Sequence, residues 1–94
     1  MPTRIDDVLL DDTWVFFRDG ADFLSVHVVV GRPVPVPDSL EARWSCPVVF
    51  EGLKPEVTHV EGIGPLDAAA NAFSFIRRFA DGLAPSYTSI LNAG

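Results

Sequence analysis

A single stretch of this sequence has helical periodicity, and it comes after every segment that alternates as a strand does. Over residues 65–81 the polar side chains recur at intervals of four, three, four and three residues, which places them on one narrow stripe of a helix. They are Asp67, Asn71, Ser74, Arg78 and Asp81. Strands followed by one helix predict an α+β fold.

Four segments ahead of the helix have the composition of strands. Residues 12–17 and 23–30 flank an Asp-Gly turn and predict a hairpin, and residues 41–52 and 56–62 flank a turn over 51–55. Pro47 removes a ladder hydrogen bond, so its strand bulges there or lies at an edge. We expect a mainly antiparallel sheet of three to five strands with one long amphipathic helix packed on it.

Three prolines on alternate residues, Pro33, Pro35 and Pro37, follow the second strand. Alternate backbone N–H groups of an extended chain point to the same side, so the three missing donors lie along one edge. The N–H groups of Val34 and Val36 point to the other edge and remain able to pair. The segment is predicted to be an edge strand or a polyproline-type connector.

The predicted helix carries little polar surface for one that lies on a sheet with its back in water. Phenylalanine, isoleucine, leucine and alanine side chains cover most of its circumference outside the polar stripe. We therefore expect the C-terminal tail (84–94), the acidic N-terminal segment (1–11) or a second subunit to cover it. The candidate interaction surface consists of Phe75, Phe79, Arg78, Asp6, Asp7, Asp11 and Asp12.

The charge and the cysteine content exclude several classes of protein. The chain of 94 residues, which we expect to form a single domain over 1–94, has a net charge of −6 and lacks the clustered Lys and Arg of a nucleic-acid binder. Cys46 is the only cysteine, which excludes an internal disulfide and a thiolate zinc cluster. The sequence has neither the pattern of a signal peptide nor that of a membrane span, so we expect a cytoplasmic protein.

The stretch GIGPLDAAANAF, starting at Gly62, has the outline of a dinucleotide-binding turn. In the G-x-G-x-x-G pattern the third glycine position is Asp67, whose carboxylate would repel a pyrophosphate, and Pro65 deletes one N–H group that would hold the anion. The glycines are better explained by a sharp turn into the helix.

Three residues, His27, Cys46 and His59, form a metal site or a Cys–His pair if their strands are neighbours. Their spacing has no ligand signature, and Cys46 shares a strand face with Trp44 and Phe50, as a buried structural thiol does. Surface histidines and a structural cysteine are therefore the favoured interpretation. No other catalytic signature is present, and we expect no enzyme activity, no cofactor and no metal.

Several features in order along the chain resemble a family of small bacterial domains of unknown function. They are Arg32-Pro33, Trp44 with Cys46-Pro47, Gly62 or Gly64, and the helix over 67–79. The resemblance implies a small α+β fold and carries no activity over to this chain.

The leading hypothesis is a small acidic, non-enzymatic protein-interaction module that self-associates, as a homodimer, or binds a basic partner protein. One alternative is an immunity protein that inhibits a toxin or nuclease with its acidic N-terminal half. The other is a small enzyme or metal site at His27, Cys46 and His59.

Overall fold

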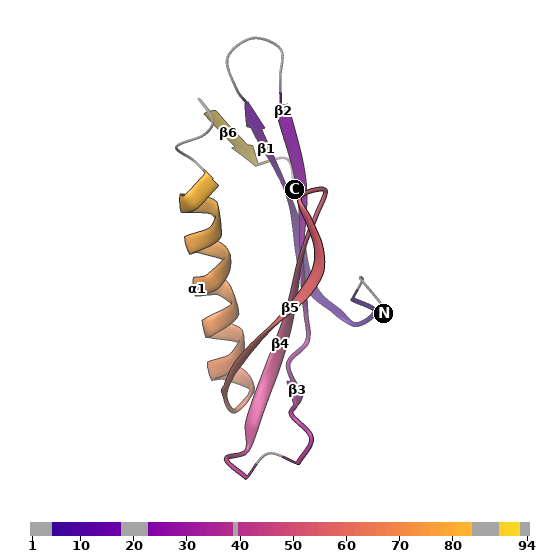
Figure 1. Ribbon diagram of the computed structural model, residues 1–94, viewed down its shortest axis with the longest axis vertical. Helices are drawn as coiled ribbons and strands as arrows, with labels where there is room; N and C mark the ends of the chain where they lie inside the picture. The colour runs from indigo at the N-terminus through magenta and orange to yellow at the C-terminus, as the bar shows by residue number, and fades with distance from the viewer. Residues whose placement is uncertain (1–4, 18–22, 39, 84–88, 93–94) are drawn as a thin grey trace.

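A computed structural model describes residues 5–17, 23–38, 40–83 and 89–92, the last of these by backbone alone. The elements are β1 (Val8–Phe17), β2 (Phe23–Gly31), β3 (Val34–Pro35), β4 (Arg43–Glu51), β5 (Lys54–Ile63), α1 (Pro65–Leu83) and β6 (Ser89–Asn92). Their strands pair antiparallel in one six-stranded sheet, in the order β3-β4-β2-β1-β6 with β5 on β4. The helix lies along one face of this sheet (Figure 1). The predicted α+β class and the helix-on-sheet arrangement are confirmed.

Strand β1 is longer than the sequence predicted, and the C-terminal tail contributes a further strand. β1 begins at Val8 rather than at residue 12, because residues 8–12 pair with β2 across an irregularity between Val8 and Leu10. Tertiary pairing thus overrides the low strand propensity of the aspartates. From the tail, β6 pairs with Trp14–Phe17 of β1. The predicted Asp-Gly turn lies outside the described residues.

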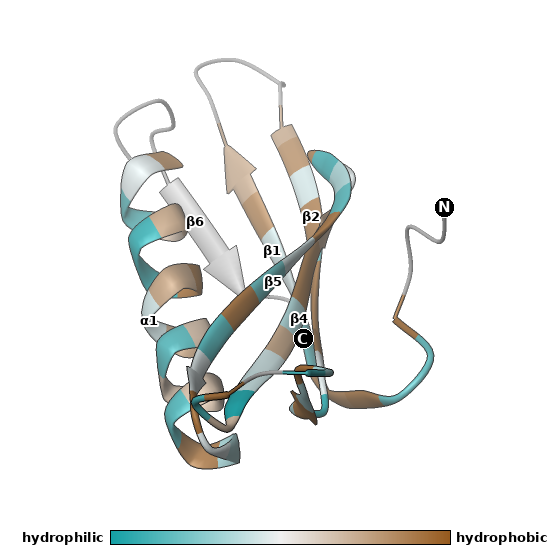
Figure 2. Cartoon of the chain, turned by 60° about the horizontal axis from the view of Figure 1, so that its bottom comes forward, coloured by the Kyte–Doolittle hydropathy of each residue, from teal (hydrophilic) through white to brown (hydrophobic). Residues whose placement is uncertain are grey.

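The core lies between α1 and the face of the sheet that α1 covers, the helix-side face. Successive side chains of a strand point to opposite faces, and most of the hydrophobic residues on this face are buried (Figure 2 gives the hydropathy of each residue). The buried residues are Phe16, Val26, Val28, Val30, Cys46, Val48 and Phe50, with Ala68 and Ala72 from the helix. Phe75, Ile76 and Phe79 pack against this cluster from α1. The opposite face of the sheet is called the outer face below.

The edge prediction for the proline segment is confirmed. β3 pairs with β4 through Val34 and Pro35, and the N–H of Val36 donates to the carbonyl of Arg43 at 2.9 Å. Pro47 lies within β4, between the stretch that pairs with β3 and the stretch that pairs with β2. It therefore interrupts a strand that has partners on both sides, at the point where the partner changes.

The two glycines before α1 form a joint, as predicted. Gly64 has a φ of 89°, which glycine adopts without strain. A Cβ on Gly62 would lie 2.5 Å from the backbone nitrogen of Ala68, so the first turn of the helix packs directly on the backbone of β5. The carboxylate of Asp67 accepts a hydrogen bond from the N–H of Ile63 at 2.8 Å. Asp67 therefore connects the first turn of α1 to the end of β5.

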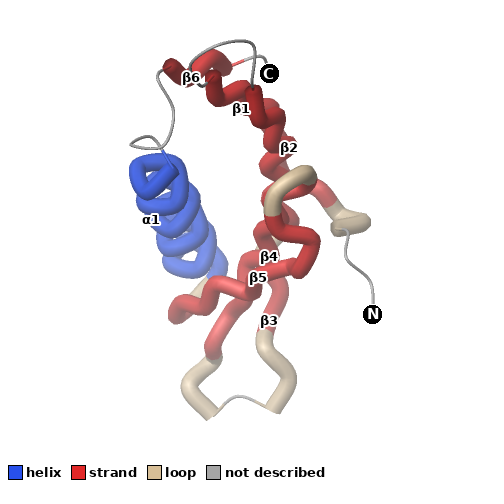
Figure 3. The backbone as a smooth tube through the Cα atoms, turned by 45° about the horizontal axis from the view of Figure 1, so that its top comes forward, coloured by secondary structure: helices blue, strands red, loops and turns tan. Residues whose placement is uncertain are grey.

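The helix covers only part of the sheet. It packs against β4 and β5, and Figure 3 shows β1 and β6 standing away from it. Its exposed large apolar side chains are Leu66, with 86% of its surface accessible, and Phe73, with 42%. The sheet buries Ala68 and Ala72 and partly covers Phe75, Ile76 and Phe79. On the helix-side face of β1, Phe16 is buried while Leu10 exposes 53% of its surface.

Candidate functional site

An apolar groove runs between α1 and β1, where the helix leaves the sheet uncovered. One part of it is a recess of about 150 Å³ between the two elements, and a wider part continues toward the end of the helix. Trp14, Phe73 and Ile76 line both parts. The remaining lining consists of Leu10, Asp11, Asp12, Val28 and Val30 in the first part, and Phe16, Arg77, Ala80 and Asp81 in the second. We call this surface the α1–β1 groove.

The two walls of the α1–β1 groove have different charge. Asp12 lies on the β1 wall and Asp11 at its edge, with the Asp11 carboxylate turned to His27 on the outer face. Arg77 lies on the α1 wall with Asp81 one helical turn further on. Its apolar lining remains accessible: Leu10 exposes 53% of its surface and Phe73 exposes 42%. Exposed apolar side chains that gather in one groove, with charges at its rim, are typical of a contact surface for another protein.

A second constellation lies on the outer face, where His27 is held between two carboxylates on neighbouring strands. Asp11 Oδ2 of β1 lies 2.7 Å from Nε2 of His27, and Glu51 Oε1 of β4 lies 2.8 Å from Nδ1. All three side chains are partly exposed. We call this the Asp11–His27–Glu51 cluster; it ties three adjacent strands together.

These two hydrogen bonds determine the protonation of His27. The bond to Asp11 and then the bond to Glu51 raise the pKa of His27 above its ordinary value of 6.5, against the lowering effect of partial burial. Both bonds favour the charged imidazolium, because it donates from both ring nitrogens. Ile5, Asp6, Val8 and Val29 complete the recess around the cluster.

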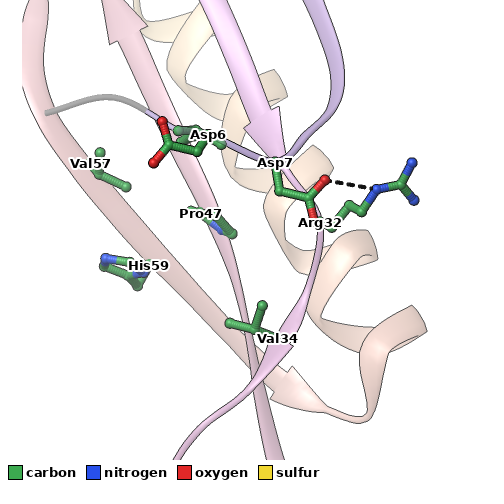
Figure 4. A pocket seen from close by; sticks show the side chains of 8 residues that line it. Asp6, Asp7, Arg32, Val34, Pro47, Val57 and His59 are labelled. Atoms are coloured by element: carbon green, nitrogen blue, oxygen red, sulfur yellow. Dashed lines mark hydrogen bonds and ion pairs between the residues drawn. The ribbon is translucent and has the colours of Figure 1, made fainter. Parts of the chain in front are cut away.

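A further pocket, of about 230 Å³, lies on the outer face between the N-terminal segment and the strands β3, β4 and β5 (Figure 4). Val34, Pro47 and Val57 give it an apolar lining, with Ile5 from the N-terminal segment. Its polar lining is Asp6, His59 and the ion pair between Asp7 and Arg32 at 3.1 Å. Nearby, Ser45 Oγ and His59 Nδ1 are 3.4 Å apart, too long for a strong hydrogen bond.

The structure does not bring His27, Cys46 and His59 together. Cys46 lies in the core on the helix-side face, whereas His27 and His59 belong to the outer-face positions of their strands. The Cys46 Sγ donates to the carbonyl of Gly31 at 3.3 Å, and burial raises the pKa of its thiol. Among the described residues, no three His, Cys, Asp or Glu side chains are arranged so that they could hold a metal ion together.

The residues of the candidate interaction surface fall in different places. Phe75 and Phe79 are partly buried and face Phe50, while Arg78 is exposed on the helix. Most of the contact made by the two phenylalanines is thus with their own core. Their contribution to a binding surface stays a prediction, and the exposed apolar residue of this helix segment is Phe73.

The four aspartates of that surface make different contacts, and their role in binding stays a prediction. Asp7 pairs with Arg32 and Asp11 with His27, and the carboxylate of Asp12 accepts the N–H of Thr13 at 2.9 Å. Asp6 faces the recess beside the Asp11–His27–Glu51 cluster.

Sequence reasoning missed Glu51 as a partner of His27. Both residues lie at odd positions of their strands, which face outward, but the register that sets Glu51 opposite His27 has no local signal.

No protein-family model matches the chain, and neither a curated protein nor a solved structure matches it. In the part of the chain that the structure describes, no helix combines the length and the apolar character needed to cross a membrane.

Proposed function

We propose that this protein is a non-enzymatic interaction module that self-associates through the α1–β1 groove. The observation that carries the proposal is the groove itself: α1 packs on β4 and β5 and leaves apolar side chains of β1 and α1 exposed beside each other. Burying such side chains stabilises an interface by up to about 1.5–3 kcal/mol for each one that becomes fully buried.

A second copy of the chain fits the charges of the groove. In a two-fold dimer the same patch faces itself, so the α1 wall of one copy lies against the β1 wall of the other. Arg77 would then approach Asp12 of the second copy, which lies on the helix-side face of β1, and this contact occurs twice. The patch carries both signs of charge and is thus complementary to itself, although the chain as a whole is acidic.

The hypothesis of an immunity protein with an acidic inhibitory half has less support. It needs aspartates that are available to a basic partner. Asp7 and Asp11 instead pair with Arg32 and His27 of their own chain. A basic partner would have to displace those contacts first.

The test is the mass of the protein in solution from about 1 to 100 μM, a range that brackets a micromolar dimer. We expect a dimer for the wild type and a monomer for Phe73→Glu, which puts a charge into the apolar lining of the groove. Leu66→Glu is the matched control, since Leu66 is more exposed on the same helix but lies outside the groove lining. It should remain dimeric.

A wild type that is monomeric over the whole range would overturn the proposal. So would a dimer that Leu66→Glu dissociates and Phe73→Glu leaves intact, because the contact surface would then lie elsewhere on α1.

A further inference from the structure

We propose that the Asp11–His27–Glu51 cluster is a pH-sensitive clamp that holds the N-terminal half of β1 on the sheet, and with it the β1 wall of the α1–β1 groove. The clamp lies within one chain and does not depend on dimerisation. Its effect on assembly rests on the proposed function.

The register places the three residues so that one ring bridges three strands. Glu51 of β4 is directly opposite His27, and Thr13 of β1 is opposite His27 on the other side. Asp11 is two residues from Thr13 and reaches the ring diagonally across the same face. The two ring nitrogens point to opposite neighbours, with contacts of 2.7 and 2.8 Å.

The protonation state of the His27 ring determines whether both contacts, to Asp11 and to Glu51, are hydrogen bonds. An imidazolium donates one hydrogen bond to each carboxylate, and the cluster then carries a net charge of −1. A neutral imidazole has one N–H, so one carboxylate oxygen faces a ring lone pair, and the net charge of the cluster becomes −2. Loss of the proton thus removes a charge-assisted bond and adds repulsion between the strands.

None of the described residues that line the recess supplies a positive charge in place of the lost proton. The N-terminal segment presents Asp6 to the same recess, β1 presents Asp11, β4 presents Glu51, and the other described lining residues are apolar. Neither lysine nor arginine is among the described residues that line it. After deprotonation, Asp11 and Glu51 face an uncharged ring, and Asp6 lines the same recess.

The strand half that bears Asp11 is the weakly held part of β1. β6 pairs with Trp14–Phe17, and among the described residues no strand pairs with the corresponding edge of residues 8–13. The ladder to β2 is irregular between Val8 and Leu10. Leu10, Asp11 and Asp12 line the groove, so fraying of this half displaces one of its walls.

The direction of the pH effect follows from the raised pKa of His27. A group whose pKa is higher in the folded than in the unfolded state stabilises the fold fully below the unfolded value, here about 6.5. That stabilisation is lost as the pH rises through the higher folded-state pKa. The clamp is therefore closed in mildly acidic solution and opens toward alkaline pH.

The experiment follows His27 by NMR together with the exchange protection of the backbone amides of residues 9–13, corrected for the intrinsic pH dependence of exchange. We expect His27 to titrate above 6.5, and the protection of these amides to fall about two- to fivefold across the same step, as suits a partly exposed ion pair. The amides of residues 46–50 in β4 should show no step. In His27→Gln the step should vanish, and in the control His59→Gln it should remain.

Titration of the wild-type His27 ring at or below 6.5 would overturn the clamp even if His27→Gln did not fold. Persistence of the step in a folded His27→Gln would do the same.

The oligomeric state is measured separately, as the mass of the protein in solution. A monomeric wild type that shows the protection step refutes the proposed function and supports the clamp. A dimer whose dissociation constant is constant across the step refutes the link between the clamp and assembly, whereas weakening of the dimer above the step supports it.

Discussion

The ring of Phe79 on α1 stacks on the ring of Phe50 on β4, with 4.0 Å between the ring centroids and 14° between the ring planes. Phe50 exposes only 1% of its surface and also contacts Phe75 and Trp14. It is therefore the side chain through which the helix, the central strand β4 and the first strand meet.

Replacing Phe50 by alanine should lower the free energy of unfolding by about 3–5 kcal/mol, since it removes a fully buried ring and leaves a cavity. Chemical denaturation measures this. Phe23→Ala is the matched control, because Phe23 exposes 64% of its surface at the start of β2. Its cost should be below about 1 kcal/mol. Equal costs for the two variants would contradict the position of Phe50 in the core.

Two glycines near opposite ends of α1, Gly62 and Gly82, should respond to alanine with opposite changes in stability. A Cβ on Gly62 would meet the backbone of Ala68 at 2.5 Å, so Gly62→Ala must push α1 away from β5 and should cost about 1–3 kcal/mol. Gly82 lies in the last turn of α1 with no atom within 4 Å of its Cβ position. Gly82→Ala should stabilise the fold by about 0.5–1 kcal/mol, because alanine loses less backbone entropy in a helix. Thermal or urea unfolding of the two variants decides this, and a stabilised Gly62→Ala would refute the close packing.

The thiol of Cys46 should react with a thiol-specific reagent at neutral pH only as fast as the fold opens. It is fully buried, it donates to the carbonyl of Gly31, and burial raises its pKa, so little thiolate is present and none is accessible. The labelling rate in buffer, compared with the rate in denaturing urea, measures this. Rapid labelling of the native protein would show that Cys46 is not enclosed.

The unfolding free energy should also report on His27. We expect the wild type to be more stable than His27→Gln below about pH 6.5, by about 1 kcal/mol or less because solvent screens the cluster. The difference should shrink as the pH rises through the folded-state pKa of His27, which its hydrogen bonds to Asp11 and Glu51 raise. A difference that grows with pH would mean that the neutral ring is the stabilising form.

The features that the sequence predicted are those whose cause lies within a few residues. The alternating prolines at 33, 35 and 37 led to the edge strand, and the glycine pair before Pro65 led to the joint. In each case the local backbone or side-chain pattern alone dictates the outcome.

What the sequence did not predict depends on which segments meet. Residues 8–11 form strand because β2 pairs with them, although aspartates favour turns. The helix pattern separated a polar stripe from an apolar remainder but could not say that Phe75 and Phe79 face β4 while Phe73 stays accessible. The position at which α1 crosses the sheet determines which of these phenylalanines are covered. The contacts of His27 depend likewise on the register of three strands.

The prolines around β3 have a consequence for how far an assembly of this protein can grow. The nitrogens of Pro33, Pro35 and Pro37 carry no hydrogen, and the N–H of Val36 is already bound to β4. The free side of this segment therefore offers carbonyl groups without matching donors. Cross-β fibres lengthen by templating each incoming chain on a complete row of donors and acceptors. The edge formed by β3 is therefore a poor template for an added strand. At high protein concentration, fibres are not expected to grow from this edge, and assemblies of limited size are favoured.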